Sequence, residues 1–157
     1  MPRITPSLWF DTEAEEAASF YASIFPRSEI GEISHYTDAG PGPAGTAVVV
    51  SFKLDGQPLI AINGGPLFSF TEAISLAIDC ADQAEVDYYW EKLTDGGEEG
   101  QCGWLKDRYG LSWQVVPSEM GSIMGDPDPV RAERAMRAML QMRKLDVAAL
   151  RAAADGA

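Results

Sequence analysis

Positive charge and cysteine are both scarce in this chain, and each scarcity excludes a class of function. Of 157 residues only 12 are Lys or Arg against 24 Asp or Glu, which gives a net charge of −12. An acidic surface repels phosphate backbones, so we expect no nucleic-acid partner. The two cysteines, Cys80 and Cys102, have no CxxC spacing, so we expect two buried free thiols rather than a zinc cluster or a disulfide.

The charge is unevenly distributed. Residues 131–157 carry +3, so residues 1–130 carry −15. Solubility is the simpler explanation of the acidic part, and attraction of cationic ligands is the weaker alternative.

Long apolar runs are also absent. No run approaches the ~18 residues of a transmembrane helix, and Met1-Pro2-Arg3 is not followed by the apolar core of a secretory signal. We expect a cytoplasmic protein with no membrane partner.

A 68-residue repeat organises the rest. The segment SLWFD at 7–11 is followed by Phe-Tyr at 20–21, and SLAID at 75–79 is followed at the same offsets by Tyr-Tyr at 88–89. Short matches of this kind also arise by chance. Each copy predicts a strand that leads into an amphipathic helix.

The helix starts carry capping-box spacing, with Thr12 before Glu15 and Asp82 before Glu85. Strands are expected after each helix, which makes each half a β-α-β-β-β unit. The expected strands are 29–37, 46–54 and 58–63 in the first half, and 73–80, 100–105 and 111–116 in the second, with a short one possible around 106.

Residues 118–157 lie outside the repeat. Residues 120–126 have no regular pattern, whereas Asp128 and Pro129 predict a helix start and a second helix is expected from Asp146 to before Gly156. These helices have apolar stripes that fit either packing within the chain or packing against a second subunit.

The run CGWLKDRYGLSWQVVP at 102–117 predicts a hairpin, in which Gly110 closes the turn with positive φ. This run, together with Asn63-Gly64-Gly65-Pro66, resembles the PhnB-like branch of the vicinal oxygen chelate superfamily. Members of this branch carry a 3-demethylubiquinone-9 3-methyltransferase label, and glyoxalase I and the bleomycin-resistance proteins are relatives.

The resemblance implies an α+β, glyoxalase-like fold, with two βαβββ modules that form a curved sheet around a pocket, plus C-terminal helices. The modules would span about 3–66 and 72–117 within one domain at 1–117, and the helical extension would span 118–157. The resemblance also implies a homodimer.

Catalytic relatives bind a divalent metal through imidazole and carboxylate groups. The matching positions here are Thr5, Ala73, Gln114, and either Ala61 or Asn63, which offer at most neutral oxygens. We therefore expect no metal and no cofactor. The single histidine, His35, has either a structural role or contacts the ligand.

The ligand expected for such a pocket is a small aromatic or partly apolar molecule. Strand alternation puts Ser7 and Trp9 on one face, and it puts Gln114 toward the pocket with Trp113 toward the core. The expected ligand-binding residues are Ser7, Trp9, His35, Phe52, Asn63, Phe68, Phe70, Trp104, Ser112 and Gln114. Aromatic residues on strands are more often part of the core than ligand contacts. The charged turn at 106–108 fits a solvated corner or a local ion pair better than a catalytic dyad.

Three function classes remain. The first is a metal-free protein that binds a small molecule, and the second is an enzyme acting on a small organic substrate. The third is the methyltransferase of the family label, acting on a demethylubiquinone-like quinol. The glycines at 40 and 42 alternate with prolines and do not resemble a nucleotide-binding or S-adenosylmethionine-binding loop.

Overall fold

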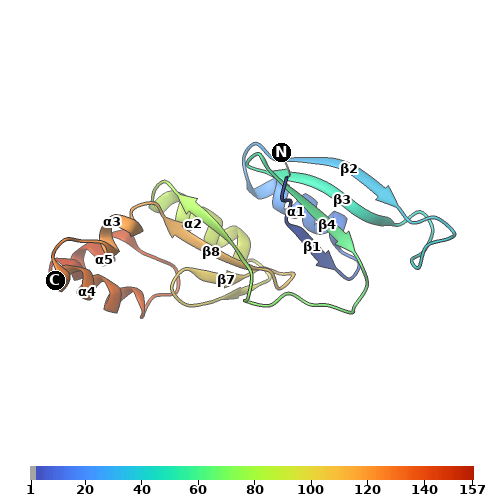
Figure 1. The fold of residues 1–157 in the computed structure, drawn as a ribbon. Coiled ribbons are helices and arrows are strands. Elements are labelled where there is room, and N and C mark those ends of the chain that lie inside the picture. Colours follow the sequence, from blue (N-terminus) through green and yellow to red (C-terminus); the bar gives the residue numbers. More distant parts are fainter. Residues whose placement is uncertain (1–2) are drawn as a thin grey trace. The chain divides into compact units, whose positions relative to one another are not determined.

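A computed structural model of the chain describes residues 3–157, which divide into two compact units between Ser69 and Phe70 (Figure 1). The first unit contains β1 (Ser7–Phe10), α1 (Ala14–Ile24), β2 (Glu29–His35), β3 (Ala47–Leu54) and β4 (Gln57–Asn63). Its sheet has the order β1-β4-β3-β2, with β1 parallel to β4 and the other pairs antiparallel.

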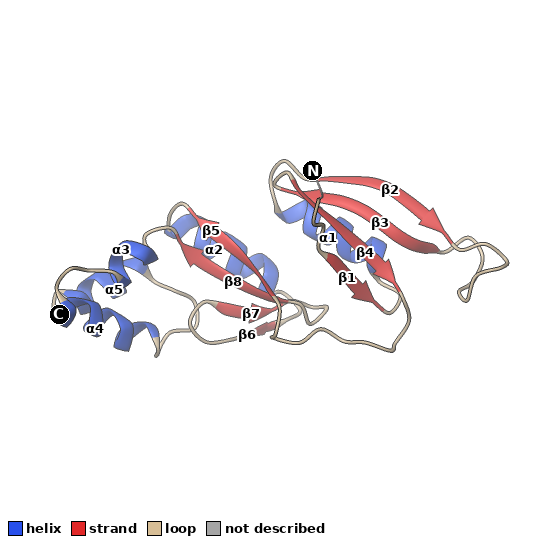
Figure 2. Ribbon diagram, in the orientation of Figure 1, coloured by secondary structure: helices blue, strands red, loops and turns tan. Residues whose placement is uncertain are grey.

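The second unit repeats this topology and then adds helices (Figure 2). It contains β5 (Ser75–Cys80), α2 (Gln83–Thr94), β6 (Glu98–Glu99), β7 (Trp104–Lys106), β8 (Ser112–Pro117), α3 (Met120–Met124), α4 (Pro129–Met139) and α5 (Val147–Ala154). The order β5-β8-β7-β6, with β5 parallel to β8, matches that of the first sheet. The α+β class and the repeat of two βαβββ modules are therefore confirmed.

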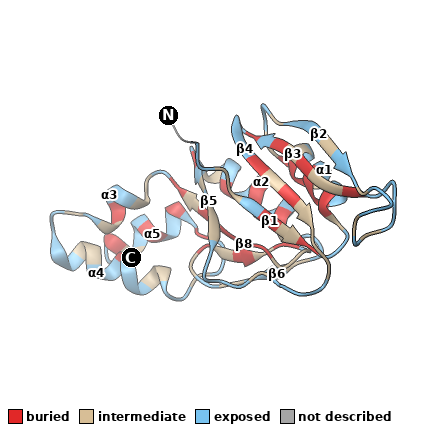
Figure 3. Cartoon of the chain, turned by 45° about the vertical axis from the view of Figure 1, so that its right-hand side comes forward, coloured by how far each residue is buried: buried red, intermediate tan, exposed pale blue. Residues whose placement is uncertain are grey.

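One face of each sheet is apolar and is covered by the helix of its own module. In the first unit α1 packs against β3 and β4, and the ring of Phe52 stacks on Tyr21 with centroids 6.4 Å apart. In the second unit α2 packs against β7 and β8, and Trp113 is 3% exposed on that apolar face. The buried segments in Figure 3 follow these contacts. The prediction that Trp113 belongs to the core is confirmed.

The two helix starts differ. Asp82 accepts a hydrogen bond from the backbone N–H of Glu85 at 2.9 Å, as its capping-box spacing predicts. The capping box expected at Thr12 is wrong, because the residue before α1 is Glu13 and no local side chain caps the helix. The Asn63 amide does so instead, from β4, by accepting from the Ala14 N–H at 2.8 Å.

The expected hairpin is present in β7 and β8, with Gly110 at φ 85°. Within its turn Arg108 is exposed and pairs with Asp95 at 3.2 Å, as a local ion pair predicts, but the Asp107 side chain is 3% exposed and does not lie in a solvated corner. One Asp107 oxygen accepts from the backbone N–H groups of Tyr109 and Leu111, and the other accepts from Trp113 Nε1. The buried carboxylate therefore organises the turn.

The strand expected at 100–105 is instead two strands, β6 and β7. Cys102 at φ 57° and Gly103 at φ 84° turn the backbone between them. Cys80 is buried and Cys102 is half-buried, and neither forms a disulfide within residues 3–157.

The C-terminal helices form their own small core around Ile123, Leu150 and Ala154. Residues 120–124, expected to be irregular, form α3, and the starts predicted at Asp128 and Asp146 are confirmed by side-chain caps. No helix within residues 3–157 is both long and apolar enough to cross a membrane.

The extension is joined to the second module at two places. The backbone N–H groups of Cys102 and Gly103 donate to the carbonyls of Met142 and Arg143 at 2.9 and 2.8 Å, and the Gln83 amide at the start of α2 makes the other contact. Its Nε2 donates to the Leu145 carbonyl and its Oε1 accepts from the Val147 N–H, each at 2.9 Å. The ion pair between Lys144 and Asp87 lies beside it at 2.8 Å. The helices at 118–157 therefore pack against the second module of the same chain.

Candidate functional site

The faces of the sheets that the helices leave uncovered carry the candidate binding groups. Antiparallel and parallel registers align side chains in rows across the strands, and alternate residues of each strand share a face. In the first unit one such row is Ser34, Val49, Ile62 and Trp9. The next row contains Ser51, Ile60 and Ser7.

Trp9 is held in place on this uncovered face. Its indole Nε1 donates to the carbonyl of Gly65 at 2.9 Å, and its ring meets Phe68 edge to face with centroids 5.0 Å apart. Gly64 lies against the Trp9 ring so closely that a Cβ would overlap it. Phe68 is itself 60% exposed, so this aromatic pair presents apolar area to solvent. Trp9 and Phe68, two expected site residues, are thus in contact.

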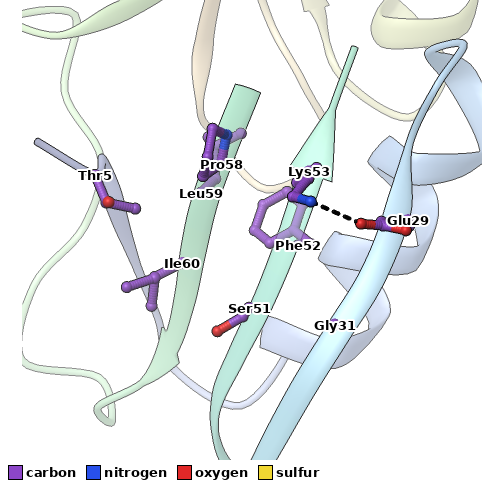
Figure 4. Close-up of a pocket in the computed structure, with 9 residues that line it drawn as sticks. All are labelled: Thr5, Glu29, Gly31, Ser51, Phe52, Lys53, Pro58, Leu59 and Ile60. Carbon is purple, nitrogen blue, oxygen red and sulfur yellow. Dashed lines mark hydrogen bonds and ion pairs between the residues drawn. The ribbon is translucent and has the colours of Figure 1, made fainter. Parts of the chain in front are cut away.

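A groove of about 240 Å³ lies on the same sheet, where β2 and β4 begin and β3 ends (Figure 4). Its floor is mostly apolar, with Pro58 and Ile60 on β4 and Ser51 on β3. At its edge Lys53 pairs with Glu29 from the adjacent strand at 2.9 Å, so that pair contributes no net charge. Two of its lining residues, Thr5 and Phe52, were singled out in the sequence, whereas no motif marked the others as part of a site.

The second unit presents a more polar face. The registers align Gln114 with Trp104 on one side and with Ala77 on the other. The Gln114 amide Nε2 donates to the Ser75 hydroxyl at 2.9 Å. Gln114 Oε1 makes no hydrogen bond within residues 3–157, so it remains an acceptor beside the half-buried Trp104 ring.

The adjacent row is Glu98, Lys106, Ser112 and Ser75, and it borders a second groove of about 160 Å³. Glu72, from the segment before β5, pairs with Lys106. Their hydrogen bond raises the pKa of Lys106 and lowers the pKa of Glu72, so both groups are charged at neutral pH.

Ser112 in this groove is 1% exposed, and its hydroxyl has no hydrogen-bond partner within residues 3–157. Such an unsatisfied buried hydroxyl is uncommon in folded proteins. The predicted residues Trp104, Ser112 and Gln114 thus share one face, as their strand parity required. The repeat also placed Ser75, the counterpart of Ser7, on this face. No sequence signal marked Glu72 and Glu98.

Other expected site residues are mainly structural. Phe52 is among the residues that line the first groove, but it is 2% exposed and stacks on Tyr21 under α1. The Asn63 amide caps α1 and donates to the Ala47 carbonyl at 3.0 Å. His35 is exposed at the end of β2. Phe70 is half-buried in the connection that precedes β5. Within their own units, neither Phe52 nor Asn63 shares the face that carries Trp9.

The side chains at the superfamily's metal positions do not fit a divalent metal. Thr5 lines the first groove with a neutral hydroxyl, and the Gln114 amide is already hydrogen-bonded to Ser75. No group of three His, Cys, Asp or Glu side chains within residues 3–157 could hold a metal ion. Imidazole and carboxylate ligands, which such metals prefer, are therefore not assembled in the part of the chain that the structure describes.

S-adenosylmethionine does not fit either. A backbone cradle for such a cofactor needs glycines between a strand and the following helix. The β1–α1 connection at 11–13 and the β5–α2 connection at 81–82 contain none. Gly40 and Gly42 lie in the β2–β3 loop, where both pack against the Tyr36 ring.

Comparisons with known proteins extend this description. The family model described as 3-demethylubiquinone-9 3-methyltransferase matches residues 2–116. The PhnB protein from Bacillus cereus is 38% identical with a TM-score of 0.68, and the match covers 74% of this chain and 99% of that one. No curated protein matches the chain.

Two further structures share the fold. A protein from Pseudomonas aeruginosa is 20% identical with a TM-score of 0.62, covering 74% of this chain and 98% of that one. The fosfomycin resistance protein FosX from Listeria monocytogenes, in complex with Mn(II) and sulfate, is 16% identical with a TM-score of 0.53, covering 79% of this chain and 95% of that one. At these identities the likeness concerns the fold alone.

Proposed function

The chain belongs to the family described as 3-demethylubiquinone-9 3-methyltransferase, which is the PhnB-like branch of the glyoxalase and bleomycin-resistance fold. From that premise we propose that it binds a small organic molecule without a metal. The proposed ligand is an aromatic compound with a hydroxyl group. It would lie on the uncovered face of the second module, with its ring against Trp104 and its hydroxyl on Gln114.

The observation that carries this proposal is the state of the Gln114 amide. Its donor side is hydrogen-bonded to Ser75, whereas Oε1 faces the same surface as Trp104 without a partner in residues 3–157. An amide fixed in this way offers one directional acceptor next to an aromatic ring, which suits a phenol or hydroquinone. Because an amide is neutral, it binds such a group with little desolvation of charge.

A thermal-shift screen of hydroxylated aromatic and quinone-like compounds tests the proposal. A ligand at about 100 times its Kd should raise Tm by about 5 °C or more in a domain of this size. Gln114→Leu keeps the volume but removes the acceptor, and Trp104→Ala removes the ring, so each should weaken the hit. Gln141→Leu makes the same chemical change on the exposed helical extension and is the matched control.

If a compound raises the Tm of Gln114→Leu and of Trp104→Ala as much as it raises the Tm of the unchanged protein, the proposed binding site is wrong. The proposal also requires that the protein purified without chelators contain no stoichiometric metal. Elemental analysis that finds one equivalent of zinc, nickel, manganese or iron would contradict it.

Methyl transfer is the activity named in the family description. It predicts binding of S-adenosylmethionine that calorimetry would detect, and our proposal predicts none. A measurable Kd for S-adenosylmethionine would contradict our proposal and favour methyl transfer.

A homodimer is part of the same proposal. Apolar side chains that a single chain leaves largely exposed support it, namely Leu67 at 75% and Ile74 at 69%. Light scattering at micromolar concentration should give twice the mass of one 17.0 kDa chain. A monomer mass at that concentration would contradict this part alone.

A further inference from the structure

Methionine is concentrated in the helical extension. Of the six methionines only Met1 precedes residue 120, and the other five are Met120, Met124, Met136, Met139 and Met142. The cores of the two modules consist of aliphatic and aromatic residues and Cys80. All thioether sulfur atoms within residues 3–157 therefore belong to the extension.

Four of these methionines are half-buried against the small core of the extension, namely Met120, Met124, Met139 and Met142. A half-buried thioether is partly accessible to a small oxidant and partly in contact with apolar neighbours. Methionine also adapts to irregular packing, which is the simpler explanation of its abundance. Packing alone gives no reason for any one of the four to differ from the others.

Met139 and Met142 do differ, because they lie at the junction with the second module. The Met142 carbonyl accepts from the backbone N–H of Cys102 at 2.9 Å, and the Met139 carbonyl accepts from the Cys102 thiol at 3.6 Å. The backbone N–H of Gly103 donates to the Arg143 carbonyl at 2.8 Å. The turn between β6 and β7 is thus hydrogen-bonded to the segment that contains both methionines.

This junction is tightly packed. Gly103 has φ 84°, and a Cβ at this position would lie 2.9 Å from the Leu145 side chain. The Gly103 carbonyl also accepts from the Val115 N–H at 2.8 Å, and β7 begins at the next residue, Trp104. Movement of residues 139–145 would therefore disturb the turn that leads into β7.

We infer that Met139 and Met142 form an oxidation site, and that conversion of their thioethers to sulfoxides by a peroxide loosens the extension from the second module. In this step the sulfur attacks one oxygen of hydrogen peroxide and the O–O bond breaks. The attacked oxygen stays on sulfur, and its proton goes to the departing hydroxide, which leaves as water. Sulfur is oxidised by two electrons and the peroxide is reduced.

The sulfoxide is polar, so it loses free energy when it remains against apolar neighbours without a hydrogen-bond donor. We expect the oxidised side chains to turn toward water and to carry the carbonyls of residues 139 and 142 away from Cys102. A methionine sulfoxide reductase with a dithiol reverses the step, because the dithiol becomes a disulfide and the oxygen leaves as water. The modification is therefore reversible.

The test treats the full chain with millimolar hydrogen peroxide and then with dithiothreitol, which reduces sulfenic acids and disulfides but leaves sulfoxides unchanged. Mass spectrometry of peptides should find one added oxygen on Met139 and on Met142. Oxidation should lower the Tm by about 5 °C or more. It should also accelerate hydrogen exchange at the Cys102 and Gly103 amides about tenfold or more, and a methionine sulfoxide reductase should restore both values.

Two pairs of variants locate the effect. Met139→Leu combined with Met142→Leu keeps the apolar volume without the sulfur, so the protein should fold normally and its exchange should no longer respond to peroxide. The matched control is Met120→Leu combined with Met124→Leu, the same changes on α3 in the same small core. This control should retain the response. Met136→Leu should retain it too, since Met136 is 41% exposed.

Three results would overturn the inference. They are failure of peroxide to oxidise Met139 and Met142 under conditions that oxidise the denatured chain, oxidation of both without faster exchange at Cys102 and Gly103, and an exchange response that survives their replacement by leucine. Should the leucine variant be unstable, repair of the oxidised unchanged protein decides, because sulfoxide reduction that leaves exchange fast would contradict the inference. These measurements use no ligand, so their outcome is independent of the proposed function.

Discussion

Trp113 donates a hydrogen bond from its indole Nε1 to Oδ2 of Asp107 at 2.8 Å, and both side chains are 3% exposed. The other Asp107 oxygen holds the turn by accepting two backbone N–H groups. One carboxylate thus fixes both the turn and the residue next to Gln114 on β8. The orientation of the candidate site depends on this buried contact.

We expect Asp107→Ala to destabilise the protein by about 3–5 kcal/mol, because three donors lose their charged acceptor inside the fold. Urea unfolding monitored by tryptophan fluorescence would measure this. The matched control is Asp95→Ala, which removes an exposed carboxylate paired with Arg108 in the same region. Similar losses in the two variants would contradict the role given to Asp107.

Gly64→Ala should displace Trp9, because its Cβ would overlap the indole ring. We expect a loss of about 1–3 kcal/mol, which is typical of overpacking, and a change in the Trp9 fluorescence. Gly121→Ala is the control, since its Cβ meets open space, and it should be neutral or slightly stabilising. An unchanged emission spectrum in Gly64→Ala would show that Trp9 is not fixed by this contact.

Gln83→Leu should loosen the contact between α2 and the start of α5, while the backbone hydrogen bonds of Cys102 and Gly103 to the extension remain. The Leu145 carbonyl and the Val147 N–H would lose their partners while remaining largely buried, which costs about 2–3 kcal/mol. Hydrogen exchange at the Val147 amide should accelerate, and proteolysis within residues 140–157 should increase. Lys144→Gln removes only the exposed ion pair with Asp87, so it should change both measurements little. If the Val147 amide in Gln83→Leu remains as protected from hydrogen exchange as in the unchanged protein, the role given to Gln83 is wrong.

Cys80 should make stability fall at high pH. Burial, aided by the carboxylates of Glu85 and Asp79, raises the pKa of its thiol from the ordinary 9.0 to about 12. Because the folded state holds this proton more tightly than the unfolded state, the contribution is complete below about pH 9 and is lost as the pH rises toward about 12. When the pH is raised from about 8 to about 10.5, the free energy of unfolding should decrease less steeply in Cys80→Ala than in the unchanged protein.

A thiol reagent gives an independent measurement of the same effect. The buried Cys80 should react slowly in the folded protein at neutral pH, since the thiolate is the reactive form. Cys102 is half-buried and serves as the internal comparison. Modification of Cys80 at the rate of the denatured chain would contradict its protection.

Local sequence patterns determined the order of elements and the faces of the strands. The 68-residue repeat predicted two βαβββ modules, and strand alternation assigned Trp113 and Gln114 to opposite faces. The sequence also predicted the helix caps at Asp82, Asp128 and Asp146, because a cap involves only neighbouring residues. Periodicity and capping act over a few residues, so a single sequence contains the information that they need.

The tertiary structure alone decided which partner each polar side chain has. Asn63 caps α1 from a strand 49 residues away, so the sequence suggested a pocket residue where the fold has a helix cap. Lys106 pairs with Glu72 rather than with Glu98, and the Ser112 hydroxyl is left without a partner in residues 3–157. Hydrogen bonds and ion pairs of this kind depend on distances across the sheet, and no sequence spacing encodes them. The glutamine at position 114 was visible in the sequence, whereas its fixed orientation beside Trp104 is a property of the folded sheet.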